Sequence, residues 1–409
     1  MWNLRKKAGF SLITLALLGS MGNAKLFAQE QAIFTVGPNM VTERMAQFIV
    51  PIANNIEVIG GHGNGFTALN SAEKWDKTSN TFTFSTMNYT HDIGALVQIS
   101  DGQWLIAGGA ENLGVAPGYK GAELFNPTTG TFTVTGSMVY PRTGNIAVLL
   151  DENRSLMVGG WYNNDSTENT EIYNAATGTF SVSGKLEVPR SYPWALPTSD
   201  GKAVVFWGMP PYGGTPYDSV ELYDPDAKTF TILSDTMLGE SGWLPIINHL
   251  NRPMSLQKMN DGKYLLWAYK DNNVSLITFD PESKTFSKLT TSPSIPFFSE
   301  EYPMDVLVDN KNNRAYILAL KRGTTTDVLT VYVVDLIHNT LTKALPSYTL
   351  PDNYHLNNSA NIVLEDGRIL ITGGFSETGY NTNFSPVNKT LFIELKSTAV
   401  ISPILYLLL

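Results

Sequence analysis

The stretch of residues 145–182, NIAVLLDENRSLMVGGWYNNDSTENTEIYNAATGTFSV, decides the fold of this chain. It holds an apolar run over 145–150 and a second apolar run over 155–158 that leads into a glycine pair. After a polar loop come two more short runs, 170–173 and 179–182, with a turn between them. The pattern predicts four short antiparallel strands. The first two are nearly all apolar, as expected for strands that are buried on both faces.

Glycine pairs show that this unit recurs along the chain. The pairs are Gly60-Gly61, Gly108-Gly109, Gly159-Gly160 and Gly373-Gly374, with weaker echoes at Trp207-Gly208, Trp267-Ala268 and Leu318-Ala319. Successive steps measure 48, 51, 48, 60, 51 and 55 residues. A period of about 40–50 residues that contains several short strands is typical of a β-propeller. We therefore expect an all-β, seven-bladed propeller, with each glycine pair placed where the backbone passes close to a neighbour.

Aromatic residues seven positions apart support the assignment of the third and fourth strands. The pairs are Trp75 and Phe82, Phe125 and Phe132, Tyr173 and Phe180, Tyr223 and Phe230, and Phe279 and Phe286. The turns between the two strands often begin with Asp or Asn followed by Pro, as type I turns prefer. We expect these rings to lie opposite one another across a hairpin and to belong to the core.

The fourth strands also predict how the ring closes. Six of them follow their own glycine pair or its echo, and begin at Thr81, Thr131, Thr179, Thr229, Thr285 and Thr340. The seventh is displaced to the N-terminal side, where Ile33-Phe-Thr-Val36 is similar to Thr131-Phe-Thr-Val134. We expect this N-terminal strand to complete the last blade, three strands plus one, so that no sheet edge stays free at the closure.

These motifs together resemble the kelch repeat: an apolar strand, Gly-Gly, Ala-Glu-x-aromatic-Asp/Asn-Pro, Thr-aromatic, and Met/Leu-x-x-x-Arg before the next unit. The resemblance covers essentially the whole mature chain and is clearest in the first four units. It implies a galactose-oxidase-like propeller, a scaffold that serves binding modules, sugar-acting enzymes and oxidases alike. The copper oxidases of that type need a Tyr–Cys cross-link, whereas this chain has no cysteine. We expect a propeller without the copper site, and no cofactor.

The N-terminal segment has the pattern of a signal peptide, with basic residues before an apolar stretch over 8–21 and small residues after it. We expect cleavage after Ala28, with Ala24 as the alternative. The apolar stretch is too short and too interrupted to favour a membrane anchor. The expected division is a signal peptide over 1–28, a propeller over 29–397 and an apolar tail over 398–409, whose role stays open.

Charge and composition exclude several classes of partner. Removal of residues 1–28 leaves 24 basic against 37 acidic residues, a net charge of −13, which disfavours nucleic acid. Without cysteine the chain can form no disulfide. The apolar tail is too short to cross a bilayer as a helix, and no other segment of the mature chain is long and apolar enough. We expect an exported protein, periplasmic or secreted, without a membrane span.

Strand alternation sorts the loops into two faces. The plain face carries the short turns between strands one and two, such as 100–102 and 260–262, and those between strands three and four. The loop-rich face carries the longer loops, and binding usually resides in such loops. Its aromatic residues are Trp161, Tyr162, Tyr192, Trp194, Tyr212, Tyr217, Trp243 and Tyr302. We expect Trp161, Trp194 and Trp243 to contact a ligand.

A mostly cationic set of side chains precedes the glycine pairs by about 17 residues, at the expected mouth of the central channel. Its members are Arg44, His91, Arg142, Arg190, Arg252, Glu301 and His355. Such a ring could bind a carboxylate-bearing ligand. Alternatively, these groups could pair with the acids of the third strands, namely Glu73, Glu123, Glu171 and Glu221. The sequence leaves both interpretations open.

Two functions remain. The chain lacks zinc-protease histidine spacing and any P-loop, Rossmann or Gly-x-Ser-x-Gly motif, so no metal site is predicted. The first hypothesis is a binding module for a glycan or a protein. The alternative is an isomerase similar to the sialate mutarotase type of kelch propeller, with Glu301 or His91 as the catalytic proton carrier. We favour the binding module. Whether there is catalysis stays open.

Overall fold

A computed structural model describes residues 27–53, 55–110, 118–162, 165–210, 214–245, 257–271, 273–291, 301–323, 326–351, 353–377 and 384–400. Within these residues the only helix is the single 3-10 turn η1 (Asn64–Phe66), and all other regular structure is antiparallel strand. The all-β prediction is confirmed. The predicted ligand contact Arg252 and the segment 1–26 lie outside the described residues.

Four consecutive four-stranded sheets follow the repeats in chain order. The first sheet is β2 (Phe48–Ile52), β3 (Asn55–Ile59), β4 (Ser71–Asp76) and β5 (Thr81–Thr86). The second is β6 (Ala95–Gln98), β7 (Trp104–Ala107), β8 (Ala122–Asn126) and β9 (Thr131–Val134). The third is β10 (Ile146–Leu149), β11 (Arg154–Val158), β14 (Asn169–Asn174) and β15 (Thr179–Lys185). The fourth is β16 (Trp194–Pro197), β17 (Ala203–Phe206), β18 (Val220–Asp224) and β19 (Thr229–Ser234).

Two five-stranded sheets come next. In the fifth sheet, β20 (Leu244–Pro245) and β21 (Gln257–Lys258) both pair with β22 (Tyr264–Lys270), which continues to β23 (Asn273–Asp280) and β24 (Thr285–Leu289). The sixth sheet is β25 (Glu301–Asp309), β26 (Arg314–Lys321), β27 (Val328–Asp335) and β28 (Thr340–Lys343), with β29 (Tyr348–Thr349) also on β27.

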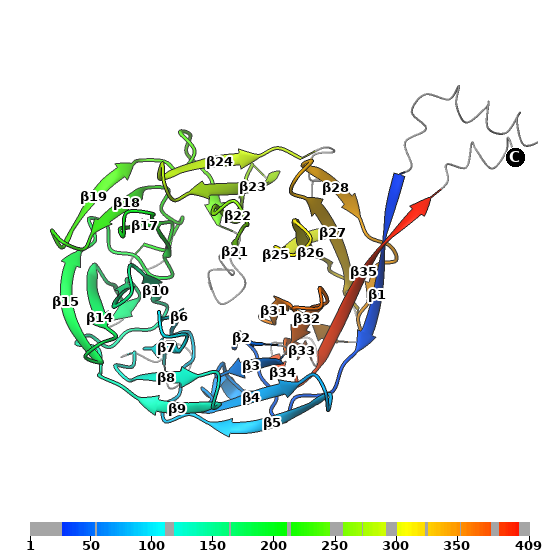
Figure 1. The fold of residues 1–409 in the computed structure, drawn as a ribbon, viewed down its shortest axis with the longest axis horizontal. Coiled ribbons are helices and arrows are strands. Elements are labelled where there is room, and N and C mark those ends of the chain that lie inside the picture. Colours follow the sequence, from blue (N-terminus) through cyan, green and yellow to red (C-terminus); the bar gives the residue numbers. More distant parts are fainter. Residues whose placement is uncertain are drawn as a thin grey trace, which may run out of the picture.

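The last sheet joins the two ends of the chain. It consists of β31 (Ala360–Val363), β32 (Ile369–Thr372), β35 (Thr390–Val400) and, as its outer strand, β1 (Phe27–Val36). The pairing runs from Phe27 opposite Val400 to Val36 opposite Leu391. The N-terminal segment therefore supplies the fourth strand of the last sheet, as the sequence predicts. Figure 1 shows the sheets side by side around a ring, with β1 (blue) beside β35 (red).

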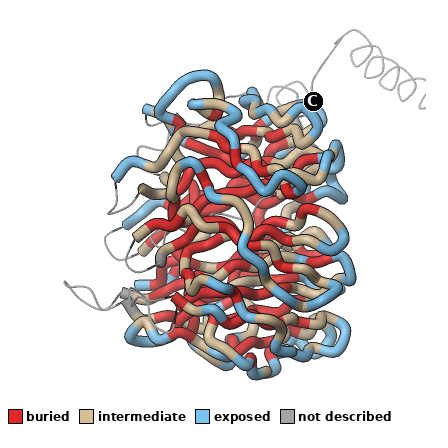
Figure 2. Tube along the Cα trace, turned by 90° about the vertical axis from the view of Figure 1, so that its left-hand side faces the viewer, coloured by how far each residue is buried: buried red, intermediate tan, exposed pale blue. Residues whose placement is uncertain are grey.

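The predicted cross-strand aromatic pairs are confirmed. All five pairs lie directly opposite one another in the third and fourth strands. Ring centroids are 4.7 Å apart for Phe125 and Phe132 and 4.9 Å apart for Phe279 and Phe286. Offset or tilted rings at this separation attract one another beyond the area that they bury. Figure 2 shows that buried residues follow the strands inside the molecule and that exposed residues gather at the loops.

Steric demand explains the glycine pairs. Gly60 and Gly61 have φ of 61° and 82°, a region that other residues rarely adopt. A Cβ atom on Gly60 would lie 2.7 Å from the carbonyl oxygen of His91, and one on Gly61 would lie 2.5 Å from that of Met45. Each pair is therefore the point where the second strand leaves its sheet against the connection between two sheets.

The two faces differ as the loop lengths predict. Two additional small sheets stand on the loop-rich face. One is the hairpin β12 (Trp161–Tyr162) and β13 (Asp165–Ser166), and the other is β30 (Tyr354–His355), β33 (Phe375–Glu377) and β34 (Phe384–Pro386). On the plain face the turns are closed by their own side chains, as where Asp224 Oδ1 accepts from the backbone N–H groups of Asp226 and Ala227.

Candidate functional site

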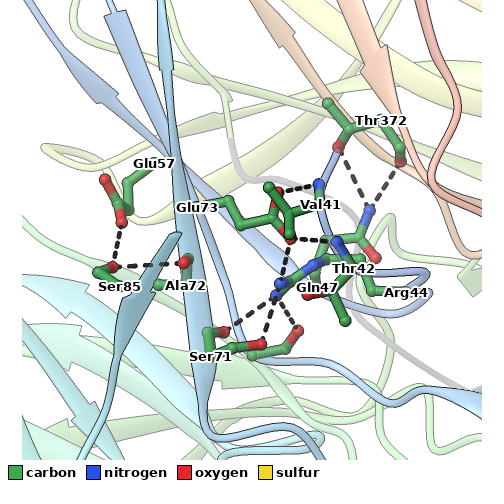
Figure 3. Close-up of polar contacts among 11 residues, drawn as sticks. Val41, Thr42, Arg44, Gln47, Glu57, Ser71, Ala72, Glu73, Ser85 and Thr372 are labelled. Carbon is green, nitrogen blue, oxygen red and sulfur yellow. Dashed lines mark hydrogen bonds and ion pairs between the residues drawn. The ribbon is translucent and has the colours of Figure 1, made fainter. Parts of the chain in front are cut away.

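Arg44 shows how the cationic residues are held. Its side chain has no exposed surface, and Nη2 donates to Glu73 Oε1 at 2.7 Å, while Glu73 is equally buried. Nη1 donates to the carbonyl oxygens of Gly60 and Ser71, each at 3.0 Å. Glu73 also accepts from the backbone N–H of Thr42 at 2.8 Å (Figure 3). The pair ties the connection before the first sheet to the second and third strands of that sheet.

The next three sheets repeat this arrangement. Arg142 donates to Glu171 at 2.8 Å and Arg190 to Glu221 at 2.6 Å, while His91 Nε2 lies 3.1 Å from Glu123. None of these side chains has exposed surface. Each of these side chains also bonds the carbonyl oxygen that ends the second strand, with Arg142, Arg190 and His91 bonding those of Gly159, Trp207 and Gly108 respectively. Each side chain is therefore held within its own sheet by its glutamate and by a strand-end carbonyl oxygen, although the Nε atoms of Arg44 and Arg142 are buried without a described partner.

This corrects the expectation of a cationic ring open to a ligand. Arg44, His91, Arg142 and Arg190 follow the second of the two interpretations, pairing with third-strand glutamates, because the long side chains turn inward beneath the loops. A buried charge is tolerated only when it is paired and hydrogen-bonded, and each of these is. They present no atom to solvent and so cannot recognise a carboxylate in this state.

Electrostatics agree with a structural role. Burial lowers the pKa of Arg142 from its ordinary value, and the neighbouring Glu171 opposes that effect. Burial pushes the pKa of Glu123 upward, but hydrogen bonds from His91 and Asn88 outweigh it and hold the pKa below its ordinary value. The carboxylate is thus stabilised as an anion inside the protein.

In the last sheet, uncharged residues take the positions of the buried arginine and glutamate. Tyr354 OH donates to the carbonyl oxygen of Gly373 at 2.9 Å, the place that an arginine takes in the first sheet. Leu391, opposite Ile371, occupies the position of the glutamate. His355, which the sequence places in the ring, instead bonds Asp327 at 2.8 Å and is 6% exposed. The counterpart of the arginines is therefore Tyr354, one residue earlier than predicted.

The two proposed proton carriers lie in different sheets. His91 is fully buried between the first and second sheets, and both ring nitrogens have partners. Glu301 is half-buried on β25, accepts from Tyr332 OH at 2.8 Å and pairs with Lys343 at 3.3 Å. Burial raises the pKa of Tyr332, and the Glu301 carboxylate raises it further. The structure does not bring His91 and Glu301 together, and it gives His91 no free nitrogen for proton transfer.

Two of the three predicted ligand-binding tryptophans belong to the core. Trp194 and Trp243 are 1% and 3% exposed and pack with Phe206 and Trp207 between the fourth and fifth sheets. The two indole side chains therefore fill space between the fourth and fifth sheets, which correspond to the longest step between repeats, 60 residues. Trp161 differs, because it is half-buried on the loop-rich face at the start of the hairpin β12–β13.

A backbone feature that the sequence analysis missed surrounds the start of the inner strands. Five residues adopt a left-handed conformation there, namely Ala46, Ile93, Gly144, Tyr192 and Asn358. Three backbone hydrogen bonds link them between sheets: Ala46 N to Asn358 O, Gly144 N to Ile93 O, and Tyr192 N to Gly144 O. A β-branched or aromatic residue with positive φ is uncommon and is often found at functional sites. Four of the five stand two residues after a buried cation, which is the signal that could have identified them.

Comparison with known proteins supports the fold. No family model matches the chain, and no curated protein matches it. Among solved structures, the chain is similar to a fungal alcohol oxidase of the AA5 family determined in complex with copper. The TM-score is 0.63 at 16% sequence identity, and the match covers 88% of this chain and 76% of that one. Together with the ring of antiparallel sheets, this likeness supports a β-propeller fold.

The copper of that oxidase does not fit this chain. The sequence has no cysteine, and the described residues contain no group of three or more His, Cys, Asp or Glu side chains that could hold a metal ion. Within the described residues, no helix is long and apolar enough to cross a membrane.

Proposed function

We propose that this chain is an exported, kelch-type propeller of seven blades, closed three-plus-one by β1, that binds a glycan or a protein through its loop-rich face. The observation that carries the proposal is the contrast between the two faces. The hairpins β12–β13 and β33–β34 and the half-buried ring of Trp161 all lie on the loop-rich face. Irregular segments held on a rigid scaffold are where proteins usually place binding residues.

The plain face supports the same conclusion, because four of its described turns satisfy their own backbone N–H groups. Asp76, Asn126, Asp280 and Asp335 each accept backbone hydrogen bonds from residues two and three positions later. Such turns satisfy their own amide groups and offer little to a partner. The scaffold is thus closed on one side and variable on the other.

Export is part of the proposal. A signal peptide over 1–28 would leave Gln29–Val36, which still pair with Leu391–Thr398 and close the last sheet. N-terminal sequencing of the protein recovered from the periplasm or the medium tests the cleavage site. A mature chain that begins beyond Val36 would contradict the proposal, because it would lack the closing strand.

Site-directed masking tests the binding face, and the absence of native cysteine makes the labelling specific. Asn64→Cys places a thiol at an exposed position of η1 on the loop-rich face. Ile337→Cys, at a position 67% exposed, places one on a plain-face turn. Each variant is coupled to maleimide polyethylene glycol and tested on a glycan array and a phage-displayed peptide library. We expect the polymer at residue 64 to abolish binding and the polymer at residue 337 to leave it intact. The opposite pattern would exclude the loop-rich face.

A further inference from the structure

We propose that the loop-rich face binds an uncharged glycan, and that a sugar ring of this glycan packs on a platform formed by Trp161, Tyr192 and Tyr217. This inference rests on the proposed function and narrows its ligand class. The three side chains are half-buried and come from β12, from the connection before β16 and from the segment between β17 and β18. We call them the aromatic platform.

The first two residues flank one dipeptide, Thr143-Gly144. Trp161 pairs with Thr143, with N–H to O distances of 2.7 and 3.3 Å. Tyr192 N donates to the carbonyl oxygen of the adjacent Gly144 at 2.8 Å. The Tyr192 ring lies over Gly144, since a Cβ atom there would be 2.5 Å from Cε1 of the ring. Backbone contacts therefore hold both aromatic residues at neighbouring positions.

Tyr217 extends the platform over the fourth sheet. Its N–H donates to the carbonyl oxygen of Gly208 at 2.9 Å, and the guanidinium of Arg190 lies 5.4 Å from its ring centre. The next residue after Gly208, Met209, pairs with Ser191, which precedes Tyr192. Because backbone hydrogen bonds hold all three aromatic residues in place, these residues have little conformational entropy left to lose when a ligand binds.

Polar atoms without a described partner belong to Trp161 itself and to residues next to Tyr192 and Gly144 in the chain. The Nε1 atom of Trp161, the Oγ atom of Ser191 and both amide atoms of the Asn145 side chain are shielded from solvent and make no hydrogen bond to any described residue. Ser191 and Asn145 are 0% and 5% exposed. A buried polar group without a hydrogen-bond partner destabilises the folded protein. Because these atoms are enclosed, a ligand hydroxyl group would reach them through enclosed water rather than directly.

The charges around the platform favour a neutral ligand. The nearest arginines, Arg142 and Arg190, form ion pairs with Glu171 and Glu221 and have no exposed surface. Burial raises the pKa of Tyr217, Arg190 lowers it, and Asp165 raises it again, which places an acid near the ring. A carboxylate-bearing ligand would therefore approach an acid without gaining a cation. This replaces the carboxylate-bearing ligand that one of the two interpretations of the sequence suggests.

The chemistry of the remaining groups matches a sugar. Aromatic rings with a polar edge present a flat apolar surface, on which the C–H face of a pyranose ring can pack. Indole, hydroxyl and amide groups are neutral donors and acceptors of the kind that fix ligand orientation in such sites. A protein partner would instead need an interface of roughly 800 Å² per partner, much wider than three rings.

Binding to a glycan array that carries neutral and sialylated oligosaccharides tests the inference, followed by titration of the best neutral glycan. We expect neutral glycans to bind and Trp161→Ala to weaken the affinity about tenfold or more. Tyr192→Ala should act in the same direction. Trp104→Ala is the matched control, because Trp104 is also a half-buried tryptophan whose Nε1 has no partner among the described residues, but it lies towards the plain face. Thermal unfolding of each variant verifies that it is folded.

Three results would overturn the inference: a preference for sialylated glycans, neutral binding that Trp161→Ala and Trp104→Ala change equally, or no glycan binding at millimolar concentration. If no glycan binds but a peptide from the displayed library does, and the polymer at residue 64 blocks it, the proposed function stands while the glycan is excluded. Binding that only the polymer at residue 337 blocks would instead reject the proposed function itself.

Discussion

Arg142 and Glu171 form an ion pair with no exposed surface, in which Nη2 of the arginine lies 2.8 Å from Oε1 of the glutamate. The same carboxylate accepts from the backbone N–H of Val139 at 2.6 Å and of Tyr140 at 3.1 Å. One buried pair therefore fixes the connection that leads into the third sheet. Its counterparts in the first, second and fourth sheets make this the chain's recurring device for joining blades.

Breaking the pair should be costly. In Glu171→Leu the guanidinium stays buried without its anion, so we expect a loss of about 3–5 kcal/mol in the free energy of unfolding. Arg142→Glu, which places two acids together, should prevent folding at room temperature. Urea denaturation followed by far-UV circular dichroism measures both. A stable, folded Arg142→Glu protein would show that the buried pair is not a structural requirement.

The last sheet suggests a rescue. Because Tyr354 and Leu391 occupy the equivalent positions there, the double variant Arg142→Tyr/Glu171→Leu should recover part of the stability lost in Glu171→Leu. Recovery should be partial, since the N–H groups of Val139 and Tyr140 lose their acceptor. A double-mutant cycle measures the coupling. If the changes in free energy of unfolding caused by Arg142→Tyr and Glu171→Leu simply add in the double variant, the two sheets are not equivalent at these positions.

Stability should fall as pH rises from about 4.5 to 7. Burial raises the pKa of Glu57 from 4.5 to about 7, against the opposing effects of Ser85 and Lys74, and burial also raises the pKa of Asp305 to about 7. In this window the folded protein binds more protons than the unfolded chain, so raising the pH favours unfolding by up to about 1.4 kcal/mol per unit and group. Urea midpoints measured across this range give the slope.

Glu57→Gln should reduce that slope, because the amide imitates the protonated acid and does not titrate. The variant should match the parent near pH 4.5 and exceed its stability at pH 8. An unchanged slope in Glu57→Gln would show that Glu57 carries no such shift.

The closing strand can be tested with two adjacent residues. Ala32 is 3% exposed and packs in the core between the sixth and last sheets, whereas the side chain of Gln31 is exposed. Ala32→Asp buries a carboxylate without a partner and should cost at least about 3 kcal/mol. It should also speed hydrogen exchange at the amides of β35. Gln31→Asp is the control and should leave both quantities unchanged. Equal effects would mean that β1 is not packed as described.

Much of the scaffold was predictable from sequence because its signals are local. The glycine pairs mark the ends of second strands, and residues seven apart, such as Tyr173 and Phe180, must face each other across a hairpin. The similarity of Ile33–Val36 to a fourth strand located the partner of β35 at the far end of the chain. These inferences need only the period of a strand and the geometry of a turn.

The side-chain directions were not predictable to the same degree. The spacing placed Arg142 near the channel mouth, but whether its guanidinium points to solvent or to Glu171 depends on tertiary packing. Trp194 stands in a segment that reads as a loop, yet it forms the first residue of β16 and is buried. His355 was placed by counting residues, and the longer connection before the last sheet moves the equivalent position to Tyr354.

Gly144 lies under the Tyr192 ring, which provides a test of the aromatic platform's geometry that needs no ligand. Gly144→Ala meets both a φ of 64° and the ring atom Cε1 at 2.5 Å, whereas Gly102→Ala meets a φ of 83° with no atom within 4 Å. The backbone strain alone costs about 1–2 kcal/mol, so Gly102→Ala should lose that amount and Gly144→Ala clearly more. Removing the ring in Gly144→Ala/Tyr192→Ala should bring the loss back towards that of the control, as measured by urea denaturation relative to Tyr192→Ala. If the double variant is no more stable than additivity predicts, the ring does not pack on Gly144 in solution, and the platform is not held in place as the structure describes.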